Sequence, residues 1–499
     1  MTMSSMDSSS IIFNYLSPTL SPAIAASIII ISALLLFPGG LAWALSLTRP
    51  TFSGPTGIVF ALASSAAHKS LAALARSFDA LRLMAFSVGL TRFIVSSHPE
   101  TAKEILSSPA FADRPIKESA YELLFNRAMG FAPFGDYWRN LRRISSTYLF
   151  NPRRVSSFQK QRSEIGEGMV RDMKRMMERN GIVEVRRMLH YGSLNNVMLT
   201  VFGKKYDFAK DEGLELELMV KEGYELLGVF NWGDHLPLLG WLDLQGVRRR
   251  CRALVAKVNV FVKKIIEEHK RRANGVGIDE GEGEDFVDVL LGLEEKDRLS
   301  ESDMVAVLWE MIFRGTDTVA ILLEWTLARM VLHPDIQSKA QAEIDSIVDS
   351  SILDSDIQRL PYLQSIVKET LRMHPPGPLL SWARLAIHDV HVGGHKIPAG
   401  TTAMVECNWA EPNKFNPDRF IDEDVNILGS DLRLAPFGSG KRVCPGKTMA
   451  LAAVHLWLAQ LLKSFKLLPS RNGVDLSECL KMSLEMKNPL VCVAVPRFE

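Results

Sequence analysis

The N-terminal part of the chain is strongly apolar and carries no charged residue from Ser8 to Thr48. Its densest run is Ile28–Ile31, and about 20 apolar residues are enough for a helix to span a bilayer. We therefore predict a short luminal tail over residues 1–21 and one transmembrane helix over residues 22–47. A cleaved signal peptide is the alternative, because Ala42-Trp43-Ala44 has the small-x-small pattern of a cleavage site. No basic segment precedes the apolar run, which favours an uncleaved anchor.

Charges on the two sides of this segment predict its orientation. Asp7 is the only charge before it, whereas basic residues follow it at Arg49, Lys69, Arg76 and Arg82. Positive charge is typical of the cytosolic side, so the remainder of the chain is expected in the cytosol. Residues 48–57, which include Gly54 and Pro55, are expected to form a hinge between the anchor and the globular part.

Hydrophobic periodicity changes along the globular part. Apolar and polar residues alternate over Leu81–Ser97, which predicts strands. Helical spacing dominates the chain that follows, with amphipathic helices over Ser157–Arg272 and a glycine-rich acidic linker over Asn274–Glu284. Ser300 is a suitable N-cap for a long helix that no proline interrupts before Pro334. The pattern favours a mainly α fold with small β-sheets.

Composition limits the class of protein further. The 499 residues are 47% apolar and 23% charged, which suits a large buried core and is too polar for a polytopic membrane protein. The net charge of +1 gives no overall electrostatic reason to expect nucleic acid as a partner. The five cysteines are scattered and include no Cys-x-x-Cys pair, which disfavours zinc and a disulfide framework. Free thiols suit a reducing compartment.

The most informative stretch for chemistry is Pro436–Gly446, which has Cys444 near its end. Glycines allow a tight loop before this cysteine, and the apolar run Met449–Leu462 predicts a helix after it. An isolated cysteine is most often a small buried hydrophobic residue. Here a helix dipole is expected to favour a thiolate, which is a metal ligand or a nucleophile. Nearby cations add to this effect, namely Lys441, Arg442 and Lys447.

The loop satisfies the pattern Phe-x-x-Gly-x-Arg-x-Cys-x-Gly through Phe437, Gly440, Arg442, Cys444 and Gly446. It resembles the heme-binding loop of the cytochrome P450 superfamily, and the chain resembles the plant A-type microsomal branch. The resemblance implies the cytochrome P450 fold, with one large domain over residues 58–499. It also implies heme b as the cofactor, Cys444 as the axial ligand of its iron, and Phe437 and Arg442 as further heme-binding residues.

The middle of the long predicted helix carries glycine and hydroxyl residues within Phe313–Val319, and such residues loosen a helix. A local widening could then hold oxygen and water. The segment resembles the oxygen-activation motif of the same superfamily. This implies that Thr318 hydrogen-bonds iron-bound oxygen and that Asp317 relays protons, so both are predicted catalytic residues. Arg314 departs from the motif, and we expect it to pair with Asp317 three residues later.

Further heme contacts are implied elsewhere. Trp138 and Arg142 are four residues apart and share one helix face. In the superfamily such a pair touches a heme propionate, although an arginine-rich surface helix would show the same spacing. Arg384 falls at the position of another propionate ligand.

A structural lock is implied by Glu369 and Arg372, which match the Glu-x-x-Arg pair of the superfamily. Arg419 is expected to complete a buried triad with them, and such a triad needs every partner. The chain is shorter than usual between Val405 and Phe415, where the superfamily carries further residues around an Asp-Pro turn and a tryptophan. This shortening is expected to strain the docking of Arg419 and to weaken heme retention.

The resemblance implies a heme-thiolate monooxygenase that inserts one oxygen atom from O2 into a lipophilic substrate, using electrons from NADPH through a P450 reductase. The segment Glu310–Ala320 resembles the group linked to organ growth, which implies a fatty-acid-like substrate. The location implied is the endoplasmic reticulum membrane, single-pass, with the catalytic domain facing the cytosol. A basic docking face for the reductase is expected at Lys441, Lys447, Arg139 and Arg143.

Other functions are compatible with the same residues. A heme-thiolate isomerase or dehydratase would work without a reductase. A heme or lipid sensor, or a form inactivated by the short segment, would not be catalytic at all.

Overall fold

The computed structural model describes residues 37, 39–46, 52–56, 66–273, 284–347, 351–380, 383–405, 413–423 and 425–498. Its helices before the centre of the chain are α3 (Leu41–Ala44), α4 (Ala67–Ser77), α5 (Pro99–Ser107), α6 (Glu118–Glu122), α7 (Asp136–Tyr148), α8 (Pro152–Ser157), α9 (Gln159–Asn180), α10 (Val185–Phe202), α11 (Asp211–Gly228), α12 (Pro237–Gly240) and α13 (Val247–Ala273). The later helices are α14 (Phe286–Leu291), α15 (Glu301–Leu332), α16 (Pro334–Ile347), α17 (Pro361–Met373), α18 (Arg419–Asp422) and α19 (Lys447–Ser464).

The strands are short and form small sheets. They are β1 (Met84–Val88), β2 (Thr91–Ser96), β3 (Val183–Glu184), β4 (Arg384–Leu385), β5 (Val390–Val392), β6 (His395–Ile397), β7 (Thr402–Val405), β8 (Phe465–Pro469), β9 (Glu478–Leu480), β10 (Leu484–Met486) and β11 (Val491–Pro496). Their order is β1-β2-β7-β4 in the largest sheet, β3-β11-β8 in the next, and β9-β10 and β5-β6 in two hairpin-like pairs. The predicted mainly α class with small β-sheets is confirmed.

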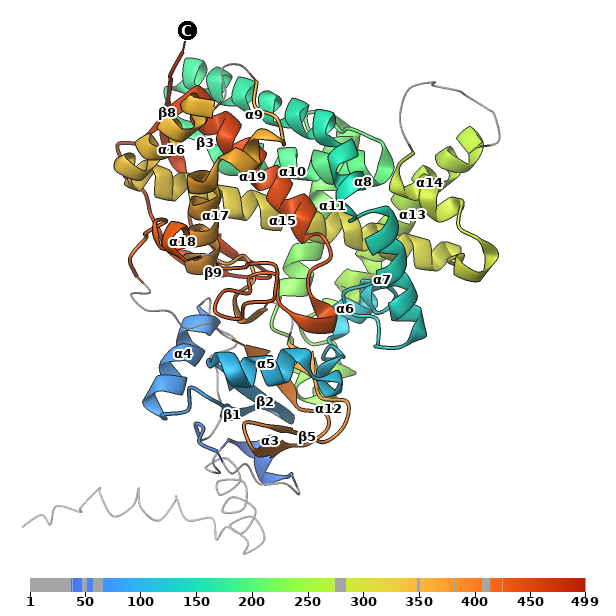
Figure 1. Cartoon of the computed structure of the whole chain (residues 1–499). Coiled ribbons are helices and arrows are strands. Elements are labelled where there is room, and N and C mark those ends of the chain that lie inside the picture. Colours follow the sequence, from blue (N-terminus) through green and yellow to red (C-terminus); the bar gives the residue numbers. More distant parts are fainter. Residues whose placement is uncertain are drawn as a thin grey trace, which may run out of the picture.

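The largest sheet joins distant parts of the sequence. β1 and β2 form an antiparallel pair in which Phe86 lies opposite Phe93, and β2 then runs parallel to β7 with Phe93 opposite Thr402. Figure 1 shows this sheet at one end of the molecule with α3, α4 and α5, while the long helices form the bulk at the other end.

Helix α15 crosses the centre of the helical part (Figure 1). Ser300 caps it as predicted, because its side chain accepts a hydrogen bond from the backbone N–H of Asp303 at 3.1 Å. Most residues of the helix are buried, and both Trp309 and Trp325 are fully buried, as expected for a helix inside a large core. It therefore provides a rigid wall for any site beside it.

The predicted anchor lies largely outside the described residues. Its last part forms α3, where Trp43 is fully buried and its indole N–H donates to the carbonyl oxygens of Phe86 at 3.1 Å and Phe93 at 3.3 Å. Residues 41–44 therefore pack onto the sheet as part of the globular fold in this structure. Among the helices that the structure describes, none has the length and apolar character needed to cross a membrane.

Candidate functional site

The loop before α19 is bent by glycines in left-handed conformations. Gly438 has φ 70° and Gly440 has φ 67°, and a Cβ atom on Gly440 would overlap the carbonyl oxygen of Leu106. The backbone N–H of Cys444 donates to the carbonyl oxygen of Phe437 at 2.9 Å and closes the loop. α19 then begins at Lys447, so the predicted loop-then-helix arrangement around Cys444 is confirmed.

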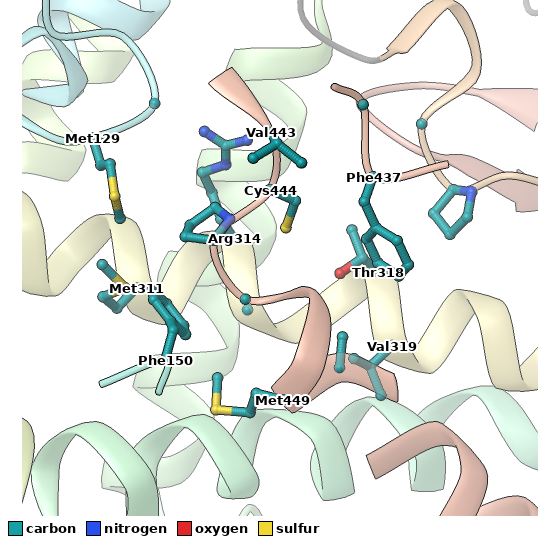
Figure 2. Close-up of a pocket in the computed structure, with 18 of the residues that line it drawn as sticks. Met129, Phe150, Met311, Arg314, Thr318, Val319, Phe437, Val443, Cys444 and Met449 are labelled. Atoms are coloured by element: carbon teal, nitrogen blue, oxygen red, sulfur yellow. The ribbon is translucent and has the colours of Figure 1, made fainter. Parts of the chain in front are cut away.

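Between this loop and α15 lies a cavity of about 230 Å³. Figure 2 shows Cys444 and Phe437 from the loop bordering the same space as Thr318 and Arg314 from α15. The predicted site residues that line this cavity are Trp138, Arg142, Thr318, Arg384, Phe437, Arg442 and Cys444. Segments separated by more than three hundred residues in the sequence thus meet around one space.

The expected thiolate at Cys444 is not favoured by the protein alone. Burial raises the pKa of the Cys444 thiol above its usual value, and this effect outweighs the cations Arg314, Arg142 and Lys447 and the backbone N–H of Gly446. The sequence-based expectation was therefore wrong on this point, because it counted local charge and the helix dipole but not the desolvation caused by distant segments. A bound metal cation would be needed to stabilise the thiolate.

Buried guanidinium groups surround the loop side of the cavity. Arg384 donates to the carbonyl oxygen of Ser439 at 3.1 Å, whereas its Nη1 atom is buried and has no hydrogen-bond partner among the described residues. The pKa of Arg384 is lowered to about 9, mainly by burial and in addition by the charges of Arg442 and Arg142. Burying a cation without a charged partner costs free energy, so an anionic group bound beside Arg384 would stabilise this arrangement.

Arg442 and Trp138 form a stacked pair. The Arg442 guanidinium lies 4.3 Å from the centroid of the Trp138 ring and donates to the carbonyl oxygens of Ala112 and Ala132 at 2.7 Å each. The indole N–H of Trp138 donates to the carbonyl oxygen of Met129 at 3.0 Å. Trp138 therefore supports Arg442 through its ring, and its N–H is already engaged rather than free for a carboxylate.

Two charged residues that line the cavity, Arg114 and Glu310, were not predicted as site residues. Arg114 is partly buried, donates to the carbonyl oxygen of Gly130 at 3.2 Å, and has a lowered pKa because of desolvation and of the charges of Arg384 and Arg442. Glu310 is buried and accepts a hydrogen bond from the backbone N–H of Gly130 at 2.7 Å. The one sequence signal for Glu310 is its spacing, since it stands four residues before Arg314 and eight before Thr318 on an apolar helix.

The charged residues of α15 do not pair as expected. Arg314 contacts Glu310, with 3.3 Å between Nη1 and Oε1, whereas Asp317 contacts His190 of α10, with 2.8 Å between Oδ1 and Nδ1. The expected pair of Arg314 with Asp317 is therefore wrong, because the two side chains leave the helix toward different neighbours. Of the two predicted catalytic residues, Thr318 lines the cavity and Asp317 does not.

The expected widening of α15 is absent from the described helix, which is continuous over its 32 residues. Instead, neighbouring helices add hydrogen bonds to its backbone. Tyr224 donates to the carbonyl oxygen of Phe313 at 2.6 Å, and Ser193 donates to that of Thr316 at 2.5 Å. Gly315 lets α10 approach closely, since a Cβ atom there would lie 2.7 Å from a methyl group of Val197.

The structural lock is formed despite the short segment. Glu369 is fully buried and accepts hydrogen bonds from Arg372 at 2.7 and 3.0 Å. Arg419 also contacts it, with 3.3 Å between Nε and Oε1. The expectation that Arg419 would dock poorly is therefore wrong, although residues 406–412 of the short segment lie outside the described residues.

Comparisons with known proteins agree with this geometry. The family model described as Cytochrome P450 matches residues 56–493. Cytochrome P450 78A5 of Arabidopsis thaliana is 62% identical over 484 residues, with 93% of this chain and 93% of that protein covered. Cytochrome P450 78A3 of Glycine max is 51% identical over 485 residues, with 92% of this chain and 91% of that protein covered.

The solved structure of a zebra fish cytochrome P450 with progesterone superimposes with a TM-score of 0.72 at 22% identity, covering 86% of this chain and 99% of that one. This likeness supports the fold, whereas the higher identities above support the family. The chain therefore belongs to the cytochrome P450 family, and within it the chain is similar to the plant 78A proteins.

Proposed function

We propose that the chain is a heme-thiolate monooxygenase that inserts one oxygen atom from O2 into a lipophilic, fatty-acid-like substrate, with electrons from NADPH delivered by a reductase. The observation that carries the proposal is that the Cys444 thiol, from the loop before α19, and the Thr318 hydroxyl, from α15, border one cavity. A metal ligand on one wall and a hydroxyl group on the other suit oxygen chemistry between them.

The residues present fit heme b. Cys444 would supply the axial ligand, and Phe437 would lie beside the ring. The two propionates would be held by Arg142, Arg384 and Arg442. The ring of Trp138 would pack against the Arg442 guanidinium and keep it in position. The unpartnered Nη1 atom of Arg384 supports this assignment, since a carboxylate would satisfy it. When bound, heme supplies the binding and reduction of dioxygen.

Thr318 is suited to act on a group inside the cavity. The neighbouring helix threonines Thr316 and Thr326 donate to the carbonyl oxygens four residues earlier, at 2.7 Å each. Among the described residues, Thr318 makes no such bond and lines the cavity instead. Its hydroxyl is therefore available to donate to bound oxygen, while Asp317 would supply protons to this side of the helix.

The cavity lining supports a lipophilic substrate. Apolar side chains that line it include Met129, Val197, Met311, Val319 and Leu322. Such surfaces bind hydrocarbon by excluding water, and the few polar groups among them orient the ligand. Arg314 and Glu310 are polar groups in the same wall, so a substrate with one polar end and a long apolar part would suit the lining.

A reductase would bind on the side of the heme-binding loop. Lys441, Arg139 and Arg143 are exposed there, and Lys447 is partly exposed. Lys441 and Arg139 both lie against the Phe134 ring, at 4.5 and 4.9 Å from its centroid, so the loop and α7 share this basic face. A basic face would attract an acidic electron donor and speed its association. We further propose that the apolar N-terminal segment holds the protein in the endoplasmic reticulum membrane, with this face in the cytosol.

The test uses the full chain in membranes together with a plant P450 reductase. We expect the carbon-monoxide difference spectrum of the reduced protein to show a band at about 450 nm, which marks thiolate ligation. The Cys444→Ser variant should lose this band. NADPH consumption with a panel of saturated fatty acids should then give hydroxylated products.

The outcomes separate the alternatives. Turnover that needs no NADPH or reductase would indicate an isomerase or dehydratase. A normal spectrum without any turnover would indicate a sensor, and failure to take up heme would indicate an inactive form. Thr318→Ala is the companion variant, because it leaves heme binding intact and should lower product formed per NADPH.

A further inference from the structure

Asp317 faces away from the cavity toward a histidine on a neighbouring helix. The Nδ1 atom of His190 in α10 lies 2.8 Å from Oδ1 of Asp317 in α15. The two side chains are partly exposed, 23% for His190 and 19% for Asp317, although the Oδ1 atom of Asp317 is itself shielded from solvent. The next residue, Thr318, lines the cavity. A titratable pair, whose histidine side chain is partly exposed, is therefore one residue away from the hydroxyl group in the site.

The helices around this pair hold it in place. Ser193, one turn after His190 on α10, donates to the carbonyl oxygen of Thr316 at 2.5 Å. On the other side, Tyr191 donates to Glu217 of α11 at 2.8 Å. The groups that act electrostatically on His190 are thus Asp317 from α15 and Glu217 from α11, and both are acidic.

We propose that His190 is a positioning residue that supplies protons from solvent to Asp317, and that Asp317 passes them to the Thr318 side of α15. This inference rests on the proposed monooxygenase function, because cleavage of reduced dioxygen consumes protons inside a site from which bulk water is excluded. The proposal explains why the Asp317 side chain contacts His190 of α10 and does not line the cavity.

The transfer is balanced at each step. The imidazolium of His190 gives its Nδ1 proton to Oδ1 of Asp317, and neutral imidazole and neutral carboxylic acid result. Asp317 returns to carboxylate when it gives this proton to the Thr318 side, and the neutral imidazole takes up a new proton from hydronium in the solvent. Proton transfer also removes both charges of the pair, so its attraction weakens and the Asp317 acid is freer to turn toward Thr318.

The local electrostatics suit a proton donor near neutral pH. Burial disfavours the imidazolium, but the hydrogen bond to Asp317 and the charges of Asp317 and Glu217 outweigh it, so the pKa of His190 lies above its usual value. His190 is therefore protonated over a wider pH range than a free histidine.

The first test measures the pair without turnover. The imidazole Cε1 carbons are labelled with ¹³C in the full chain, and the signal of His190 is identified by its loss in His190→Gln. We expect this signal to titrate with a pKa above the usual histidine value in the wild type. In Asp317→Asn the pKa should fall. An unchanged His190 pKa in Asp317→Asn would overturn the inference.

The second test measures the pH profile of NADPH consumption with reductase, normalised to cytochrome c reduction by the reductase alone. The wild-type rate should fall as pH rises through the pKa of His190. His190→Gln should be at least about tenfold slower at low pH and insensitive to pH over this range. Ser193→Ala is the matched control, because it loosens the same interface without removing a proton donor. It should slow the enzyme equally at every pH and keep the wild-type profile.

A His190→Gln variant with the wild-type rate and profile would overturn the inference. So would a profile lost equally in Ser193→Ala, since packing alone would then explain it. Failure of the proposed function is distinguishable, because it would remove the 450 nm band or the turnover from the wild type itself.

Discussion

The guanidinium of Arg442 stacks on the ring of Trp138, 4.3 Å from its centroid, although the two residues are 304 positions apart in the sequence. Both residues are buried, and the indole N–H is bonded to the carbonyl oxygen of Met129 at 3.0 Å. The ring thus holds an arginine of the loop before α19 against α7, and the N–H ties the same ring to the segment before it.

This relationship predicts a graded response at Trp138. Trp138→Phe keeps an aromatic face and loses one hydrogen bond, so it should lower the free energy of unfolding by about 1 kcal/mol. Trp138→Ala leaves a cavity and should cost about 3–5 kcal/mol and reduce heme content. Urea unfolding and heme quantification measure both effects. Equal losses in the two variants would show that the ring contributes little beyond its N–H.

Replacing Arg384 should leave the stability of the heme-free protein unchanged or higher, but it should weaken heme retention. The heme-free protein buries a guanidinium with an unpartnered Nη1 atom, so Arg384→Met should leave its free energy of unfolding unchanged or higher. The loaded protein should lose heme faster by roughly tenfold or more, because a charge-assisted hydrogen bond to a propionate is lost. Chemical unfolding without heme and heme transfer to a scavenger protein provide the two measurements. A parallel loss in both would argue against a propionate contact.

The two glycines of the loop form a matched pair. Both have positive φ, but a Cβ atom at Gly438 meets nothing within 4 Å, whereas one at Gly440 would overlap the carbonyl oxygen of Leu106. Gly438→Ala should therefore cost only the backbone strain, about 1–2 kcal/mol. Gly440→Ala should cost several kcal/mol in addition and should displace Cys444, which thermal unfolding and the carbon-monoxide spectrum would detect. Equal effects would mean that the loop moves freely away from α5.

His374 predicts how stability depends on pH. The pKa of His374 is lowered to about 4, mainly by burial. The charge of Arg329, which donates to Nε2 at 2.7 Å, lowers it further, whereas nearby Glu478 acts in the opposite direction. The unfolded state binds more protons between pH 4 and the usual histidine pKa, so stability is lost as pH falls through this window. At pH 5 the loss from this residue should be about 2 kcal/mol.

His374→Gln keeps an acceptor for Arg329 and removes the titrating ring. Its free energy of unfolding should therefore fall less between pH 7 and pH 5 than that of the wild type, as measured by urea unfolding at each pH. Since the ring stacks on Trp325 with 3.9 Å between centroids, some stability is expected to be lost at pH 7 as well. An identical pH slope in both proteins would contradict the assigned pKa.

The features that sequence predicted well are local ones. The loop around Cys444 depends on glycines and on a helix that starts immediately after it, and Ser300 caps α15 through a residue three positions away. The pair Glu369 and Arg372 follows from helix spacing alone. In each case the interacting atoms belong to one short stretch, so their geometry follows from backbone rules that a sequence already contains.

The features that sequence missed depend on packing between segments. Helix spacing shows which residues share a face, but it does not show which neighbour that face meets. Asp317 therefore contacts His190 rather than Arg314, and Glu310 and Arg114 line the cavity although neither was predicted as a site residue. Likewise, the pKa of Cys444 is raised by burial under distant segments, against the local charges.

By itself, the sequence determined the mainly helical class through hydrophobic periodicity, and the family and the cysteine and threonine that border the site through resemblance to short motifs. Only the tertiary structure decided where each charged side chain points and what it pairs with. The physical reason is that pairing and desolvation are set by contacts between helices far apart in the chain, and those contacts form only when the whole core packs.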